Sequence, residues 1–253
     1  MKEERRNENS AVRINKFLSQ AGVCSRRQAD FYVEQGKVTV DGKTAEPGTK
    51  VCEGQEVCFN GKPIRMNTQT VYLAYNKPKG IVCTSSKEEA NNIIDAVGYP
   101  SRIYPVGRLD KDSQGLILLT NDGEAANEIM KARNYHEKEY EVKVSKRITN
   151  DFIQGMRNGV PLSELDTVTR KCTVKKEGPE NFRIILTQGL NRQIRRMCEY
   201  FGYQVTRLER VRVMNIELGN LKSGEYREVT GRELDELYEQ LKGSSNNTVY
   251  EEQ

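Results

Sequence analysis

The chain has 253 residues, of which 36% are hydrophobic and 30% are charged, and its formal net charge is +4. This length is enough for about two domains. No apolar run approaches the roughly 20 residues that a membrane-spanning helix needs. The composition therefore excludes a membrane-spanning protein and indicates a soluble globular protein with a highly solvated surface.

The N-terminus and the cysteines both indicate the cytoplasm. Residues 1–9 are mostly charged or polar and lack the apolar core of a signal peptide. The six cysteines form no Cys-x-x-Cys pair, so we expect reduced thiols rather than disulfides or zinc ligands. We expect a cytoplasmic, monomeric protein that does not bind membranes.

Two short helices and small strands are predicted near the N-terminus. Residues 1–11 are polar, and we expect them to be disordered. Helical spacing of apolar residues over 12–22 is followed by a capping-box start at 25–28 for a helix that ends at Gly36. Hairpin signals, Asp-Gly and then Asn-Gly, follow before residue 62.

This pattern over residues 12–62 resembles the S4 RNA-binding domain. The fragments that carry the resemblance are Val-Arg-Ile-Asn-Lys-Phe-Leu at 12–18 and Cys-Ser-Arg-Arg-Gln-Ala-Asp at 24–30. It implies an αL-type module that binds structured RNA by shape and phosphate contacts, with a small basic domain for a protein partner as the alternative. The basic residues that we expect to contact RNA are Arg13, Lys16, Arg26, Arg27 and Lys37.

A second domain is predicted over residues 71–242, after a linker at 63–70 that has no periodicity. Residues 71–75 read as a strand, and the Asn-Lys-Pro-Lys-Gly sequence at 76–80 breaks it. The polar, acidic tail over 243–253 is expected to be disordered.

The most informative stretch of this domain is a polar loop, Gly-Arg-Leu-Asp-Lys-Asp-Ser-Gln-Gly, at 107–115. It leads into an apolar run at 116–120, which predicts a strand buried on both faces. Arg108 and Asp110 are therefore charged groups held at the rim of a core, where loops often carry function. The alternative is that the two side chains pair with each other or cap nearby backbone amides.

Three further elements follow in the second half of the chain. A helix is predicted over 124–132, and alternation predicts a strand over 137–144. The only histidine lies just before this strand, where we expect local structure rather than a catalytic base. A strand at 182–187 runs into a helix at 190–201 that is closed by a glycine.

The helix at 190–201 belongs to a segment dense in arginine. At 100° per residue, Arg192 and Arg196 point away from the apolar face, whereas Arg195 lies at its flank and can reach a cleft beside the Asp110 loop. Such a segment is typical of a protein that binds a phosphate backbone, although a solvated charged face is the alternative. The arginines that we expect to contact RNA are Arg192, Arg196, Arg207 and Arg210.

Several kinds of chemistry lack their motifs in this sequence. It contains no phosphate-binding glycine loop, no dinucleotide fingerprint, no metal-ligand cluster and no histidine for a Ser- or Cys-based triad. Carboxylate chemistry without a metal or cofactor is what is left. An aspartate beside an arginine stays ionised at neutral pH and can act as a nucleophile or as a general base.

Residues 12–242 resemble the RsuA/RluA-type pseudouridine synthases that carry an S4 domain, and are most similar to the RluF branch. The resemblance rests on the loop at 107–115 and on Gln-Gly-Leu-Asn-Arg-Gln-Ile-Arg-Arg-Met at 188–197. It implies that Asp110 is the catalytic residue and that Arg195 pairs with it. The other residues that it implies in the active site are Tyr140, stacked on the target uracil, Leu186 beneath the base, and Arg108, which holds the nucleotide out of the helix.

The activity implied by the resemblance is the isomerisation of a specific uridine to pseudouridine in large-subunit (23S) ribosomal RNA, without a cofactor or metal. A tRNA target remains open, because the sequence ends in Glu-Glu-Gln where members of that branch often carry a long basic tail. Asp110 either attacks the sugar or removes a ribose proton.

Two other functions fit the sequence less well. A glycosidase would use Asp110 and Asp112 as its carboxylate pair, but both lie on one short loop and the chain has no tryptophan to stack on a sugar. A non-catalytic RNA-binding or ribosome-assembly protein needs neither Asp110 nor Tyr140. We therefore predict an α+β enzyme in which a small S4 domain precedes a catalytic domain with a mainly antiparallel, mixed sheet and flanking helices.

Overall fold

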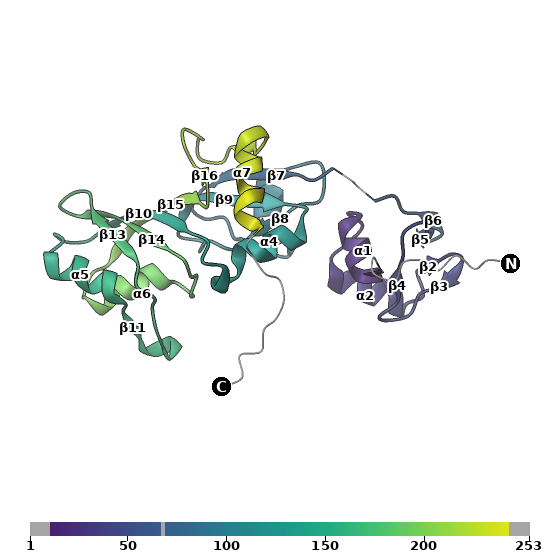
Figure 1. Cartoon of the computed structure of the whole chain (residues 1–253), viewed down its shortest axis with the longest axis horizontal. Helices are drawn as coiled ribbons and strands as arrows, with labels where there is room; N and C mark the ends of the chain where they lie inside the picture. Colours follow the sequence, from purple (N-terminus) through teal and green to yellow (C-terminus); the bar gives the residue numbers. More distant parts are fainter. Residues whose placement is uncertain (1–10, 67–68, 243–253) are drawn as a thin grey trace. The chain divides into compact units, whose positions relative to one another are not determined.

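The structure, a computed structural model, describes residues 11–66 and 69–242 (Figure 1). The chain forms two compact units, residues 1–70 and residues 71–253. Of the segments expected to be disordered, residues 1–10 and the tail at 243–253 lie outside the described residues, as do residues 67–68 of the expected linker.

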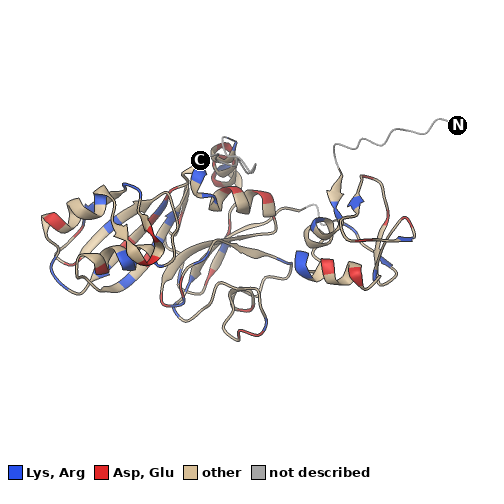
Figure 2. Ribbon diagram, turned by 90° about the horizontal axis from the view of Figure 1, so that it is seen from below, with Lys and Arg blue, Asp and Glu red and all other residues tan. Residues whose placement is uncertain are grey.

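The N-terminal unit packs two helices against short strands. Its elements are β1 (Val12–Arg13), α1 (Ile14–Gln20), α2 (Arg26–Glu34), β2 (Val38–Val40), β3 (Lys43–Thr44), β4 (Lys50–Val51), β5 (Val57–Phe59) and β6 (Lys62–Pro63). The capping box at the start of α2 is confirmed, since Gln28 N donates to Ser25 Oγ at 3.2 Å and Ser25 N donates to Gln28 Oε1 at 3.0 Å. Buried Leu18, Ala29 and Val33 hold the helices on the strands, which leaves the charged residues outside (Figure 2).

The second unit is built on one nine-stranded sheet with the order β13-β14-β10-β15-β9-β7-β17; β8 pairs with β9, and β16 with β15. These strands are β7 (Tyr72–Lys77), β8 (Tyr104–Val106), β9 (Gln114–Thr120), β10 (Lys138–Val144), β13 (Thr173–Lys176), β14 (Asn181–Leu186), β15 (Val205–Val213), β16 (Ile216–Glu217) and β17 (Tyr226–Glu228). Only the pairing of β15 with β9 is parallel among the described strands. The expected α+β class with a mainly antiparallel, mixed sheet is confirmed.

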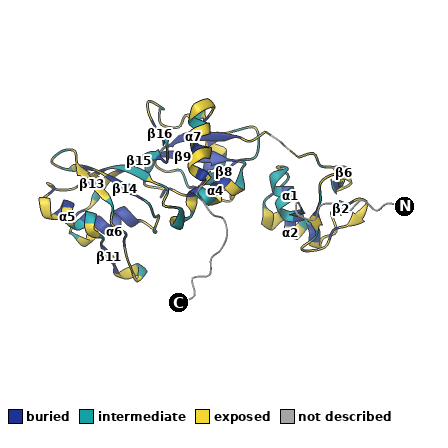
Figure 3. Ribbon diagram, in the orientation of Figure 1, coloured by how far each residue is buried: buried dark blue, intermediate teal, exposed yellow. Residues whose placement is uncertain are grey.

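Helices cover both halves of this sheet (Figure 1). They are α3 (Ile93–Val97), α4 (Gly123–Met130), α5 (Asn150–Asn158), α6 (Gln193–Tyr200) and α7 (Gly231–Leu241). One core joins α5 and α6 to β10 and β14, and a second joins α4 and α7 to β7 and β9 (Figure 3). None of the helices in the described part of the chain is long and apolar enough to cross a membrane.

Some local predictions need correction. The sequence made no prediction for α3 or α5, and the helix expected from residue 190 begins only at Gln193. The sequence around Thr230 reads as a capping box, but the Thr230 side chain makes no capping hydrogen bond to α7. A further small pair, β11 (Pro161–Leu162) and β12 (Thr167–Val168), lies outside the main sheet.

Strand β9 occupies the centre of the sheet, as its apolar sequence predicted. It pairs with β7 and β8 in antiparallel fashion and with β15 in parallel fashion, and every residue from Gly115 to Thr120 is buried. A strand with neighbours on its edges and helices on its faces exposes little to water, which is why its sequence is apolar without alternation.

Glycine is required where β9 meets β15. Gly115 has φ = +102°, and a Cβ built on it would lie 2.4 Å from the backbone oxygen and 2.7 Å from the backbone nitrogen of Arg210. Neither atom can move without displacing β15. The glycine at position 115 thus allows β9 and β15 to pair closely.

We expect Gly115→Ala to lower the free energy of unfolding by about 3 kcal/mol, from backbone strain and the clash with β15. Urea unfolding measures this as a lower midpoint at an unchanged slope. Gly189→Ala is the control: a Cβ there meets nothing within 4 Å. Equal midpoints for the two variants would contradict the close approach.

Candidate active site

A cavity of about 770 Å³ opens in the second unit where the β8–β9 loop, β10, β14, β15 and the segment before α6 meet. It brings together residues that are far apart in the sequence. Of the predicted active-site residues, those that line it are Arg108, Asp110, Tyr140 and Leu186. Lys138, Arg192 and Arg210 line it as well, whereas Arg195 is not part of its wall.

Strand register explains why these side chains share one face. Lys138 lies opposite Leu186 on β14, and Tyr140 lies opposite Ile184. Since alternate residues of a strand point to the same side, Lys138, Tyr140 and Leu186 face the cavity together. Leu186 is 3% exposed and contributes an apolar floor, while Tyr140 is half-buried and packs against two cores.

Backbone hydrogen bonds fix the loop that carries Asp110. Ser113 N donates to Asp110 O at 3.0 Å, and Gly80 N donates to Lys111 O at 2.8 Å. Leu109 N donates to the buried Cys83 Sγ at 3.3 Å. The loop therefore has a defined conformation, and the side chain of Asp110 remains 31% exposed towards the cavity.

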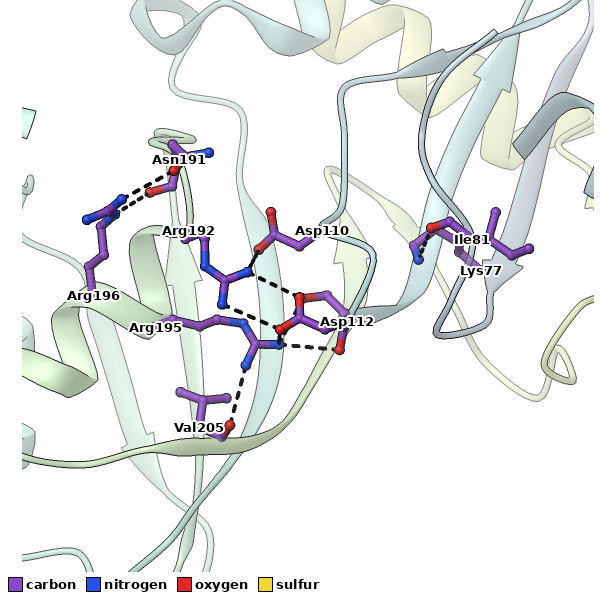
Figure 4. Close-up of polar contacts among 10 residues, drawn as sticks. Lys77, Ile81, Asp110, Asp112, Asn191, Arg192, Arg195, Arg196 and Val205 are labelled. Carbon is purple, nitrogen blue, oxygen red and sulfur yellow. Dashed lines mark hydrogen bonds and ion pairs between the residues drawn. The ribbon is translucent and has the colours of Figure 1, made fainter. Parts of the chain in front are cut away.

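Arg192, just before α6, and Arg195 of α6 hold this loop from the other side (Figure 4). Arg192 Nη1 lies 3.3 Å from Asp112 Oδ1 and 3.8 Å from Asp110 Oδ2. Arg195 Nη2 lies 3.2 Å from Asp112 Oδ2 and donates to Ser113 Oγ at 3.2 Å, and Arg195 Nη1 donates to Val205 O at 3.3 Å. Asp112 is thus held between two guanidinium groups.

The expected pairing of Arg195 with Asp110 differs from this geometry and is corrected. Arg192 is the ion-pair partner of Asp110, and Arg195 pairs with Asp112. The physical reason is that α6 begins only after Arg192. Arg192 has a left-handed backbone conformation (φ = +50°), so its side chain does not point in the direction that a helical residue would take. The alternative pairing of Arg108 with Asp110 is likewise replaced by Arg192.

Electrostatics keep Asp112 ionised. Burial raises its pKa, but a hydrogen bond from Arg192 and the charges of Arg195 and Arg192 outweigh burial and leave the pKa below its usual value. The carboxylate accepts from two cations that are themselves tied to the protein, so the clamp persists across the neutral pH range.

The arginines expected to contact RNA all have partners within the protein. Arg196 donates to Asn191 and pairs with Glu164, and Arg207 pairs with Glu209. Arg210 is 3% exposed and lines the cavity, so the RNA contact expected of it stays a prediction for the cavity rather than for the outer surface. Of the basic residues predicted to contact RNA in the N-terminal unit, Arg13, Arg26, Arg27 and Lys37 are exposed and Lys16 is half-buried.

Lys138 is the cavity residue that the sequence did not single out. Its Nζ donates to His136 O at 3.2 Å. Burial, with a smaller contribution from the charge of Arg210, lowers the pKa of Lys138 to about 8. The sequence feature that could have identified Lys138 is its position two residues before Tyr140 on an alternating strand, because this spacing puts both side chains on the same face. No cluster of three His, Cys, Asp or Glu side chains suited to a metal ion occurs in the described ranges.

Comparison with known proteins gives a consistent result. Residues 71–200 match the family model for RNA pseudouridylate synthase, and residues 12–57 match that for the S4 domain. The chain is 54% identical to the dual-specificity RNA pseudouridine synthase RluF of Escherichia coli K12, over 94% of this chain and 82% of that protein. It is 34% identical to the ribosomal large subunit pseudouridine synthase B of Bacillus subtilis, over 89% of this chain and 95% of that protein. A crystal structure of a pseudouridylate synthase matches 89% of this chain and 99% of its own, with a TM-score of 0.66 and 26% identity.

The lowered pKa of Lys138 predicts a pH-dependent cost in stability. The pKa falls from 10.5 in the unfolded chain to about 8 in the fold, so between these values the unfolded chain binds more protons and stability rises with pH. Below pH 8 the buried charge destabilises the fold. We expect Lys138→Met to raise the free energy of unfolding at pH 7 by on the order of 1–2 kcal/mol, and by less at pH 10.5.

Urea unfolding at the two pH values measures this difference. Lys143→Met on the same strand is the control, because the Lys143 side chain is 50% exposed and should give no pH-dependent gain. The same gain for Lys138→Met at both pH values would contradict the assignment.

Proposed function

Because the chain belongs to the RNA pseudouridylate synthase family, we propose that it isomerises a uridine of large-subunit ribosomal RNA to pseudouridine, with Asp110 as the catalytic group. The observation that carries this proposal is the position of Asp110 in one cavity with Tyr140 and Leu186. The cavity offers a carboxylate, an aromatic ring and an apolar floor, which are what a base and its ribose require.

The reaction needs the glycosidic bond to break and a carbon–carbon bond to replace it. The electron pair of the C1′–N1 bond moves onto the uracil, and the ribose is either captured at C1′ by the Asp110 carboxylate or loses its 2′ proton to it. The uracil turns, and C5 bonds to C1′ as Asp110 leaves or C2′ regains its proton. C5 then loses its proton and N1 gains one, so the product is an isomer of the substrate and no cofactor or metal enters the scheme.

The surrounding residues support these steps. Arg192 Nη1 lies 3.8 Å from Asp110 Oδ2 and holds the carboxylate at the edge of the cavity. Tyr140 stacks on the uracil above the floor that Leu186 provides. The Arg108 side chain is exposed at the cavity mouth and holds the target nucleotide out of the RNA helix, since a base within a helix is out of reach of the cavity.

Arg195 acts on the loop rather than on the substrate. It contacts Asp112, Ser113 and the backbone of Val205, and it is 9% exposed. It therefore fixes the position of the segment that follows Asp110. We assign Arg195 as a positioning residue and Arg192 as the direct partner of Asp110.

The S4 unit supplies a second RNA contact. The exposed Arg13, Arg26, Arg27 and Lys37 lie on β1, at the start of α2 and before β2, and the S4 family match covers all four. Ribosomal RNA is favoured as substrate by the name of the Bacillus subtilis relative, and the relative termed dual-specificity keeps a second RNA, such as tRNA, within the proposal.

Primer extension after carbodiimide labelling tests the reaction. We expect the protein to create a new stop at one uridine of a large-subunit ribosomal RNA transcript, and Asp110→Asn to abolish it with unchanged RNA affinity, because the amide can neither attack nor accept a proton. Asp235→Asn, on α7, is the matched control and should retain full activity.

A stop that persists with Asp110→Asn would contradict the catalytic assignment. The absence of a stop on ribosomal RNA, on tRNA and on pre-ribosomal particles, with tight binding retained, would instead leave an RNA-binding protein.

We also expect Arg26→Gln with Arg27→Gln to weaken RNA binding and to reduce the dependence of log K on log salt by about one for each phosphate that the variant no longer neutralises. Filter binding over a range of salt concentrations measures both quantities. Lys43→Gln with Lys62→Gln makes the same change of charge at exposed positions in β3 and β6 of this unit. Identical slopes for the two double variants would contradict an RNA contact at the start of α2.

A further inference from the structure

Arg210 is a buried cation in the wall of the active-site cavity. It is 3% exposed, and its Nε donates to Leu116 O at 2.7 Å. Its Nη2 is buried and has no hydrogen-bond partner among the described residues. A buried N–H group without a hydrogen-bond partner lowers the stability of the fold. Such a group beside a cavity indicates that a ligand in the cavity supplies the missing acceptor.

A register shift turns Arg210 towards the cavity. Glu139 lies opposite Arg212, but the next residue of β10, Tyr140, lies opposite Arg210, so Val211 has no counterpart on β10. In an unbroken strand Arg210 and Arg212 would share a face. The extra residue places them on opposite faces, with Arg212 bonded to Glu139 and Arg210 beside Tyr140.

The acidic residues beside Arg210 and Lys138 in sequence are used elsewhere. Glu139 accepts hydrogen bonds from Arg183 and Arg212, and Glu209 accepts one from Gln114 and pairs with Arg207. The strand alternation that turns Lys138 into the cavity turns Glu139 out of it. The cavity wall next to Tyr140 therefore carries two cations, the buried Arg210 and the half-buried Lys138.

We propose that Arg210 is a further catalytic residue, whose free Nη2–H binds a carbonyl oxygen of the target uracil and stabilises the negative charge that this ring carries after the C1′–N1 bond breaks. This assignment rests on the function proposed above. When the bond breaks, its electron pair moves to N1 and is shared with O2 and O4. A guanidinium fixed in the cavity wall stabilises such a charge more strongly than water does, because it is already oriented.

The contrast with Arg212 argues against a purely structural role. The Arg212 guanidinium binds Glu137, Glu139 and the carbonyl of Met214, so each of its three nitrogens has a partner. Arg210 has a partner only for its Nε among the described residues. A residue that served only to hold β15 on β9 would use its other donors within the protein.

A cycle that changes the enzyme and one atom of the substrate tests the contact. Single-turnover rates are measured with short RNAs that carry uridine, 2-thiouridine or 4-thiouridine at the target. We expect Arg210→Met to lower the rate with uridine by roughly 100-fold or more, and to leave the RNA dissociation constant within about twofold, as for a contact made to the reacting base.

Sulfur is a weaker hydrogen-bond acceptor than oxygen, and its effect on the leaving ability of the base is common to all enzymes in the cycle. At the oxygen that Arg210 binds, the thio substitution should therefore change the rate differently in wild type and in Arg210→Met, with a coupling of about 5-fold or more. Arg210→Lys, which keeps the charge and the fold, should retain part of both the rate and the coupling.

Arg232→Gln on α7 is the control for removal of an arginine, because its side chain is 92% exposed, and it should behave as wild type. Thio effects that are the same in wild type and in both Arg210 variants, at both positions, would overturn the assignment. A loss of RNA affinity with an unchanged rate at saturation would overturn it too and make Arg210 a phosphate contact. An inactive wild type would overturn the proposed function, and with it this step, so the two failures are distinguishable.

Discussion

The active-site cavity depends on the parallel contact between β9 and β15. The loop that carries Asp110 leads into β9, whereas Tyr140, Leu186 and Arg210 belong to β10, β14 and β15. The two groups of strands meet where Gly115 lies opposite Arg210. A side chain at Gly115 would push β9 and β15 apart. The lack of a Cβ at Gly115 therefore determines how close Asp110 lies to Tyr140 and Arg210.

The junction also explains the arrangement of charge around Asp110. The loop joins β8 to β9 in one half of the sheet, and α6, which packs with β10 and β14, approaches it from the other half. Arg192 and Arg195 meet Asp112 there, so the same ion pairs that hold the halves together also orient the loop. An ion pair at a partly exposed site is a modest source of stability. Its value here is geometric, because the paired carboxylate of Asp112 fixes the backbone beside Asp110.

Much of this structure could be predicted from the sequence, and the failures have physical causes. The buried run of β9 and the capping box at Ser25 follow from local patterns that the fold keeps, whereas the joint placement of Asp110, Tyr140 and Leu186 was implied by the family resemblance. The partners of Arg192, Arg195 and Arg210 could not be predicted, since each of these partners comes from a distant segment. The inward direction of Arg210 depends on one unpaired residue in β15, and strict alternation assumes that no such residue exists. Arg192 was assigned a helical direction although its backbone is left-handed.

The buried Arg210 and the half-buried Lys138 make the folded protein less stable than its packing allows. Lys138 loses hydration in the cavity wall, as its lowered pKa indicates, and Arg210 leaves a buried donor without a partner among the described residues. Apolar side chains of similar size would fill these positions at lower cost. Local rules of packing and polar satisfaction are broken mainly at functional sites. Under the proposed function, an anionic uracil ring between Tyr140 and Leu186 would supply both the missing acceptor and the missing negative charge. The cavity would then bind the substrate more tightly after its glycosidic bond has broken than before.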